Sequence, residues 1–170
     1  MLALLALYPA YLGVMWGVRR YTSSLIQGME GVQLPAFSLT DLQGEVFDNQ
    51  RLAGKWVVLN FFRSKCHGCR AERGDIRTLG QELDPEKAQL LGIMVDRVQG
   101  FPAEVTEQTL ADYGYQHPVL MADDAFVDAF HGAGWSQITP ITYVADGEGR
   151  IVQSFRYPYR VEDVLAVIQS

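Results

Sequence analysis

Residues 56–72 read WVVLNFFRSKCHGCRAE, an almost unbroken apolar run that is followed by two cysteines three positions apart. The apolar part, residues 56–62, is typical of a strand that is buried on both faces. We expect a helix over about residues 69–83, so that Cys66 and Cys69 lie where this helix begins. The stretch therefore predicts a strand, a CxxC motif and a helix in direct succession, as part of an α/β fold.

The place of the CxxC motif favours reactive thiolates. Unpaired backbone N–H groups and the helix dipole put partial positive charge at the start of a helix. His67 and several basic residues lie close by in the sequence: Arg63, Lys65, Arg70, Arg73 and Arg77. Because the thiolate is the nucleophile in disulfide exchange, we expect Cys66 to attack a partner and Cys69 to resolve the mixed disulfide.

Strand and helix patterns alternate through the rest of the chain. The expected elements are a β-hairpin at 36–40 and 45–48, strands at 89–95 and 119–121, a hairpin at 141–145 and 150–155, and helices at 102–113, 123–130 and 161–168. This order predicts a mixed sheet with parallel crossovers in the middle and a terminal antiparallel hairpin.

Three segments resemble a known family. Residues 60–72 resemble the active-site segment of thioredoxin-fold proteins and are most similar to the TlpA/ResA branch of membrane-anchored thiol:disulfide oxidoreductases. LPAFSL at 34–39, with Gly44, matches the opening hairpin of that branch, and residues 138–151 match its TP…D…G-x-I segment. The resemblance covers about residues 34–170. It implies a thioredoxin-like fold with an N-terminal β-hairpin and an inserted αβ element at 96–115.

The resemblance also implies two further catalytic residues. Pro140 matches the family's cis-proline, which lies against the CxxC motif and helps to dock an extended substrate chain. Glu72 matches an acidic residue three positions after the second cysteine; positions i and i+3 share a helix face, so its carboxylate is placed to exchange protons with that thiol. The chain departs from the family at Lys65, where Trp is usual, and at Gly68, where Pro is usual. We expect Lys65 to stabilise the adjacent thiolate and to make the pair a stronger oxidant.

The N-terminal segment is apolar. Residues 1–18 contain no Asp, Glu, Lys, Arg or His. At about 1.5 Å per residue they reach roughly 27 Å, just short of a hydrocarbon core of about 30 Å. We predict a transmembrane anchor over residues 1–20, a linker over 21–34 and a thioredoxin-like domain over 35–170. A cleaved signal peptide and a buried N-terminal helix remain alternatives.

Two signals disagree about the side of the membrane on which the domain lies. Arg19 and Arg20 follow the apolar run, and the positive-inside rule puts them, and the domain after them, in the cytoplasm. The family resemblance instead implies that the anchor lies in the inner membrane and the domain faces the periplasm, where a redox-active disulfide persists.

The predicted function is that of a membrane-tethered thiol:disulfide oxidoreductase that exchanges electrons with protein dithiols and disulfides, without a cofactor or a metal. The net charge of -6 argues against a nucleic-acid partner. Two alternatives are a thioredoxin-like accessory subunit of a larger membrane complex and a Sco-like copper chaperone, although that family spaces its cysteines CxxxC. A peroxiredoxin is disfavoured, because Leu59 and Arg63 stand where that family needs Pro and Thr. Trp135 is expected either in the core or at the edge of the substrate surface.

Overall fold

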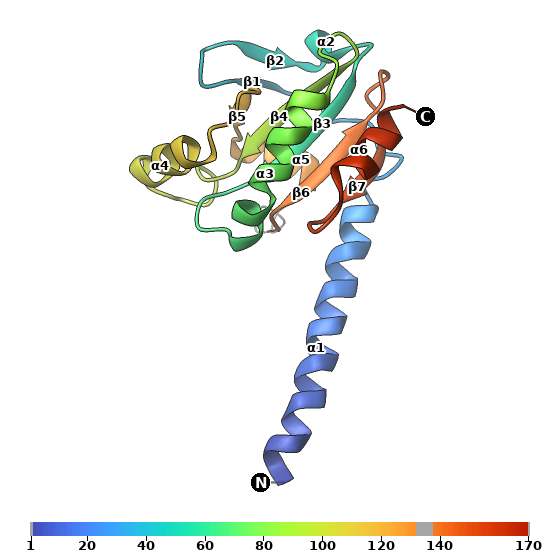
Figure 1. Cartoon of the computed structure of the whole chain (residues 1–170), viewed down its shortest axis with the longest axis vertical. Helices are drawn as coiled ribbons and strands as arrows, with labels where there is room; N and C mark the ends of the chain where they lie inside the picture. Colours follow the sequence, from blue (N-terminus) through green and yellow to red (C-terminus); the bar gives the residue numbers. More distant parts are fainter. Residues whose placement is uncertain (1, 132–137, 170) are drawn as a thin grey trace.

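A five-stranded mixed sheet forms the centre of the computed structural model, which describes residues 2–131 and 138–169 (Figure 1). The strands, in their order across the sheet, are β5 (Val119–Met121), β4 (Ala88–Met94), β3 (Trp56–Phe62), β6 (Ile141–Ala145) and β7 (Ile151–Phe155). β3, β4 and β5 are parallel, β6 is antiparallel to β3, and β7 is antiparallel to β6. The predicted mixed sheet with a terminal antiparallel hairpin is therefore confirmed.

β3 is the central strand, and every residue after Trp56 in it is buried. Its alternate side chains enter two cores. Leu59 and Phe61 point to one face, which α5 (Asp124–His131) covers. Val58 points to the other face, where it packs under the helices α3 (His67–Glu82) and α6 (Val161–Ile168). This two-sided burial explains why the strand sequence is apolar without interruption except at Asn60.

The remaining elements also lie close to their predicted places. β1 (Ser38–Thr40) and β2 (Val46–Asp48) form the predicted N-terminal hairpin. α4 (Ala103–Tyr113) ends at Gly114, whose left-handed φ of 59° terminates the helix. A short helix, α2 (Asn49–Leu52), was not predicted; it begins because the Asp48 side chain accepts a hydrogen bond from the Arg51 N–H at 2.8 Å.

The segment predicted as a linker, residues 21–34, is structured instead. α1 (Leu2–Gln27) runs through its first part, and Ile26 is buried in the core. Backbone hydrogen bonds of 2.7–2.9 Å then join residues 31–34 to residues 149–151. The physical reason is that Ile26 and Leu34 are apolar and pack against the domain, which a free tether does not do.

α1 stands away from the domain over most of its length (Figure 1). Its exposed large apolar side chains are Tyr8, Tyr11, Leu12, Val14, Met15, Trp16, Val18 and Tyr21. Among the helices of the described residues, none meets the length and apolarity needed to cross a membrane. α3 begins at the end of the domain from which α1 emerges (Figure 1). The CxxC motif and α1 are therefore at the same end of the domain.

Candidate active site

Cys66 and Cys69 form a disulfide at the start of α3, where the sequence predicts the reactive pair. Cys66 is the N-cap residue, and its Sγ accepts a hydrogen bond from the Cys69 backbone N–H at 3.1 Å. Cys66 is 7% exposed and Cys69 only 1%. The first cysteine is therefore the one nearer to the surface, which is what the predicted division of roles requires.

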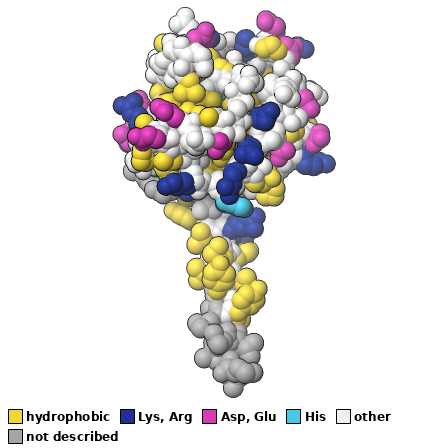
Figure 2. Space-filling model, turned by 60° about the vertical axis from the view of Figure 1, so that its left-hand side comes forward, with side chains coloured by type: hydrophobic (Ala, Val, Ile, Leu, Met, Phe, Trp, Pro, Cys, Tyr) yellow, Lys and Arg dark blue, Asp and Glu magenta, His cyan; other side chains and the backbone are white. Residues whose placement is uncertain are grey.

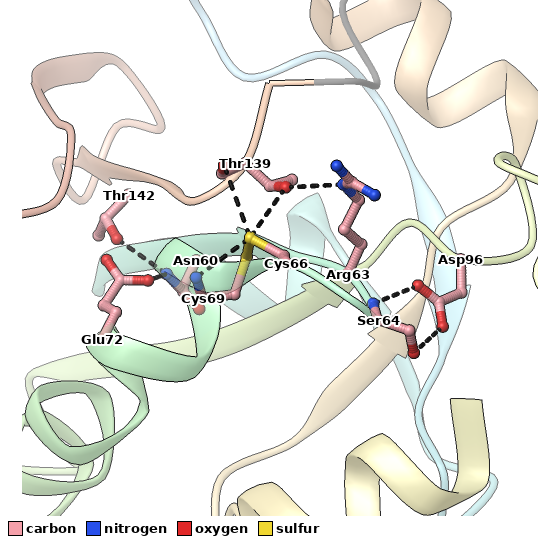
Figure 3. The surroundings of a disulfide bond; sticks show 9 residues. All are labelled: Asn60, Arg63, Ser64, Cys66, Cys69, Glu72, Asp96, Thr139 and Thr142. Carbon is pink, nitrogen blue, oxygen red and sulfur yellow. Dashed lines mark hydrogen bonds between the residues drawn. A yellow bond between two sulfur atoms is a disulfide. The ribbon is translucent and has the colours of Figure 1, made fainter. Parts of the chain in front are cut away.

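The Thr139–Pro140 peptide bond is cis, as the sequence predicts for Pro140. Thr139 contacts the disulfide directly: its Oγ1 lies 3.5 Å from Cys66 Sγ, and its carbonyl oxygen lies 3.7 Å from the same sulfur (Figure 3). Arg63 Nε donates a hydrogen bond to Thr139 Oγ1 at 3.2 Å. The cis-proline loop and the strand that leads into the CxxC motif thus meet at the sulfur of Cys66.

Gly68 allows this close approach. A Cβ atom at position 68 would lie 2.8 Å from Cδ of Pro140, a distance that real Cβ contacts do not show. At the position where the family usually has Pro, this chain therefore has the residue without a side chain, and the start of α3 rests directly on Pro140.

Glu72 lies inside the protein, with only 1% of its surface exposed. Asn60 Nδ2 donates to Glu72 Oε2 and to Thr142 Oγ1, each at 3.0 Å, and the Thr142 hydroxyl lies 3.0 Å from that of Tyr159 (Figure 3 shows the first three residues). Asn60 and Thr142 face each other across β3 and β6. Glu72 Oε1 has no hydrogen-bond partner within the described part of the chain.

The environment of Glu72 changes its acidity. Burial raises the pKa of Glu72 from 4.5 to about 7, while the hydrogen bond from Asn60 and the nearby Tyr159 hydroxyl act in the opposite direction, and the Asp75 carboxylate adds a small further rise. A carboxyl group with a pKa near neutrality, and with one oxygen free, is able both to take and to give a proton. The predicted role of Glu72 in proton exchange with Cys69 remains a prediction that this geometry favours.

A second buried carboxylate, Asp96, holds the chain just before the CxxC motif. Asp96 Oδ1 accepts a hydrogen bond from the Ser64 backbone N–H at 2.7 Å, and Oδ2 accepts from the Ser64 hydroxyl (Figure 3). Thr106 of α4 donates to the same Oδ2 at 2.7 Å. Asp96 therefore ties the inserted helix α4 to the backbone two residues before Cys66.

The surroundings of Cys66 are basic and partly hollow. A surface hollow beside Cys66 is lined by Lys65, His67, Arg70 and three residues of α4, namely Thr109, Asp112 and Tyr113. Burial raises the pKa of Tyr113, and the charges of Arg73 and Arg70 oppose this. The hollow beside Cys66 is thus lined by two basic side chains, Lys65 and Arg70, and by one carboxylate, Asp112.

Several residues of the site were not predicted from the sequence. They are Asn60, Ser64, Asp96, Thr106, Thr139, Thr142 and Tyr159. The available signal was a polar side chain within an otherwise apolar run, as at Asn60 in β3. Trp135 lies outside the described residues. Among those residues, no group of three His, Cys, Asp or Glu side chains is placed to hold a metal ion.

Comparisons with known proteins agree with this site. Residues 31–154 match the model of the AhpC/TSA family. The thioredoxin-like protein YneN of Bacillus subtilis is 30% identical over 151 residues, which cover 87% of this chain and 83% of YneN. The thiol-disulfide oxidoreductase ResA of Geobacillus kaustophilus is 25% identical over 82% of this chain and 76% of its own.

The fold is also found among solved structures. A thiol:disulfide interchange protein of the thioredoxin family from Chlorobium tepidum superimposes with a TM-score of 0.67 at 25% identity, over 82% of this chain and 95% of the other. Together with the Cys66–Cys69 disulfide, these relatives confirm the predicted thiol:disulfide oxidoreductase of thioredoxin-like fold. The chain therefore belongs to the AhpC/TSA family.

Proposed function

We propose that the chain is a membrane-tethered oxidoreductase that exchanges two electrons with the dithiols and disulfides of client proteins. The observation that carries the proposal is the Cys66–Cys69 disulfide at the start of α3, with the first sulfur at a surface hollow and against Thr139. A helix start stabilises a thiolate at this position, and the resting disulfide is the oxidised half of the cycle.

The reaction proceeds in two exchange steps when the reduced chain meets a client disulfide. The Cys66 thiolate attacks one client sulfur, a bond between the two proteins forms, the client S–S bond breaks, and one client thiolate leaves and takes up a proton. Glu72 then accepts the proton of the Cys69 thiol. The Cys69 thiolate attacks Cys66, the internal disulfide closes, and the second client thiolate leaves; two electrons have passed to the client. The same steps in reverse oxidise a client dithiol.

Membrane attachment through α1 is the second part of the proposal. It is supported by the absence of charged residues and histidine from residues 1–18 and by the exposed apolar side chains along α1, including Tyr11, Val14 and Trp16. Such side chains bury themselves in lipid more favourably than in water. We place the domain on the periplasmic side of the inner membrane, because a redox-active disulfide persists in an oxidising compartment.

Substitution of each cysteine by serine tests the proposed chemistry. We expect Cys66→Ser to abolish reduction of a protein disulfide such as insulin, and Cys69→Ser to accumulate a mixed disulfide with the client that dithiothreitol releases. Equal activity of the two variants would contradict the assigned roles. A chain that stays bound to a membrane assembly through purification but has no reductase activity would support the accessory-subunit alternative instead, and copper bound to the purified protein would support the copper-chaperone alternative.

Removal of residues 1–20 tests the tether. Because Ile26 and the residues after it are the part of this region that packs on the domain, we expect the shortened chain to fold and to keep its redox activity in solution. We also expect the full chain to pellet with lipid vesicles and the shortened chain to stay in the supernatant. Cosedimentation of both forms would show that residues 1–20 are not the attachment site.

A further inference from the structure

Basic side chains lie along α3 and around the CxxC motif. Arg70, Arg73 and Arg77 are exposed at helical spacing, and Lys65 is exposed at the start of the helix. The salt bridges of the described residues involve other basic residues, Arg51, Lys87 and Arg160, so these four have no carboxylate partner there. Figure 2 shows Lys and Arg side chains in a stripe that descends to a histidine above the emerging α1.

This stripe is unusual for the chain as a whole. The protein has 14 Lys and Arg against 20 Asp and Glu, and yet the surface around its reactive sulfur is basic. The stripe continues into the hollow beside Cys66, where Lys65 and Arg70 stand on one side and Thr109 and Tyr113 of α4 on the other. The one carboxylate there, Asp112, accepts a hydrogen bond from Gln108 at 2.8 Å.

We propose that this cationic stripe, defined by Lys65, Arg70, Arg73 and Arg77, selects client proteins that carry acidic side chains beside the reacting cysteine. The inference rests on the proposed function, because it needs a client sulfur at Cys66. Charges that surround a reaction site accelerate the encounter with a partner of opposite charge and slow the encounter with one of the same charge. In the hollow, the nearest client side chains meet Arg70 and Lys65.

An anionic lipid surface fits the stripe less well. α1 runs along the vertical axis of both views, and the stripe extends upward along α3 in roughly the same direction (Figures 1 and 2). A membrane plane across α1 meets only the lower end of such a stripe. A client segment that lies along α3 from the hollow upward meets all four cations.

The test uses the full chain in a non-ionic detergent, reduced with dithiothreitol and then freed of it. Two peptides with the same internal disulfide are compared, one with Asp and one with Lys at the positions next to each cysteine. Each reaction is one exchange: the peptide disulfide is reduced to two thiols while the Cys66–Cys69 disulfide forms. We expect the acidic peptide to react about tenfold faster at low salt, with the ratio falling toward one as salt screens the charges.

Charge reversal identifies the residues responsible. We expect the double variant Arg70→Glu/Arg73→Glu to invert the ratio of the two rates, and the matched control Lys87→Glu to leave it unchanged. Lys87 is exposed, and its backbone oxygen accepts from the Trp56 N–H at the opposite end of β3 from the CxxC motif. The ratio is the readout, because both peptides see any change in the reactivity of Cys66 itself.

The outcomes separate this inference from the proposed function. Equal rates with both peptides would overturn the inference and leave the proposed function standing. A lack of reaction with either peptide would overturn both. An unchanged ratio in the Arg70→Glu/Arg73→Glu variant would overturn the assignment, and if that variant also lost binding to phosphatidylglycerol vesicles, the stripe would be a lipid-binding surface instead.

Discussion

Glu72 and Asp96 are two buried carboxylates on either side of one disulfide, and they are held in opposite ways. Asp96 is fully buried and accepts three hydrogen bonds, two of them from Ser64 and one from Thr106. Glu72 is also buried, with 1% of its surface exposed. Its Oε2 accepts a hydrogen bond from Asn60, but its Oε1 has no partner within the described residues. Asp96, whose two oxygens both accept hydrogen bonds, fixes the backbone before Cys66. Glu72, which has one oxygen without a partner in the described part of the chain, is able to take up a proton there.

The difference follows from the number of donors that each fold element supplies. A buried carboxylate with enough donors is a stable structural anchor, whereas one with few donors takes up a proton more readily, since desolvation disfavours its charge. The comparison predicts that changes at Asp96 mainly affect stability, and that changes at Glu72 mainly affect pH dependence and rate.

The largest expected effect is that of Asp96→Ala on stability. The substitution leaves the buried Ser64 backbone N–H without its acceptor, and it removes the charged acceptor of the Ser64 and Thr106 hydroxyls, which keep only neutral partners. We expect the free energy of unfolding to fall by about 4 kcal/mol. Denaturant unfolding of the oxidised chain measures this change. A loss below about 1 kcal/mol would show that the Asp96 network does not hold the loop before Cys66.

Glu72→Gln is expected to change stability in a pH-dependent manner. Between pH 4.5 and about 7 the folded chain holds the Glu72 proton that the unfolded chain has lost, so the free energy of unfolding falls as pH rises through this window. The free energy of unfolding of the variant, relative to that of the wild type, should therefore be about 3 kcal/mol higher at about pH 8 than at about pH 4. Unfolding curves of both proteins at the two pH values give the difference.

His117 also makes the stability depend on pH, but its contribution cancels from that difference. Burial lowers the pKa of His117 to about 4, so its own contribution to stability is lost as pH falls from its ordinary value of 6.5. It acts in the same way in the wild type and in Glu72→Gln, and it therefore cancels from the difference. Parallel pH profiles of the two proteins would mean that Glu72 does not hold a proton in the folded chain.

The closing step of the reaction is expected to slow in the same variant. Without a carboxylate to take the Cys69 proton, closure of the internal disulfide should be about 100-fold slower near neutral pH. The wild-type rate should rise with pH through about 7, and this rise should disappear in Glu72→Gln. Rapid quenching of the mixed disulfide with acid follows the step, and a pH profile that survives the substitution would assign the proton to another group.

Thr106→Val should have the smallest effect. It removes one of the three donors to Asp96 and leaves the other two, so we expect a loss of about 1 kcal/mol in the free energy of unfolding, with no dependence on pH. The rate of disulfide closure should stay as in the wild type. A change in that rate would show that the Asp96 network does more than hold the loop.

Much of the fold could be predicted because its signals are local. The apolar run of β3, which only Asn60 interrupts, is a property of seven neighbouring residues, and the end of α4 at Gly114 is a property of one. The structure of residues 21–34 could not be predicted in the same way, because the segment carries no strong local pattern. It depends on the burial of Ile26 and Leu34 and on the backbone hydrogen bonds that join residues 31–34 to residues 149–151.

The sequence by itself determined where the sulfurs lie, since a buried strand, a CxxC pair and a helix start follow one another along the chain. Only the tertiary structure decided what surrounds them. Asn60 and Thr142 are 82 positions apart, and Ser64 and Asp96 are 32 apart, yet each pair shares a hydrogen bond. Sequence periodicity reports which side of an element is buried, but the partner that a buried polar group meets depends on how distant strands are placed side by side.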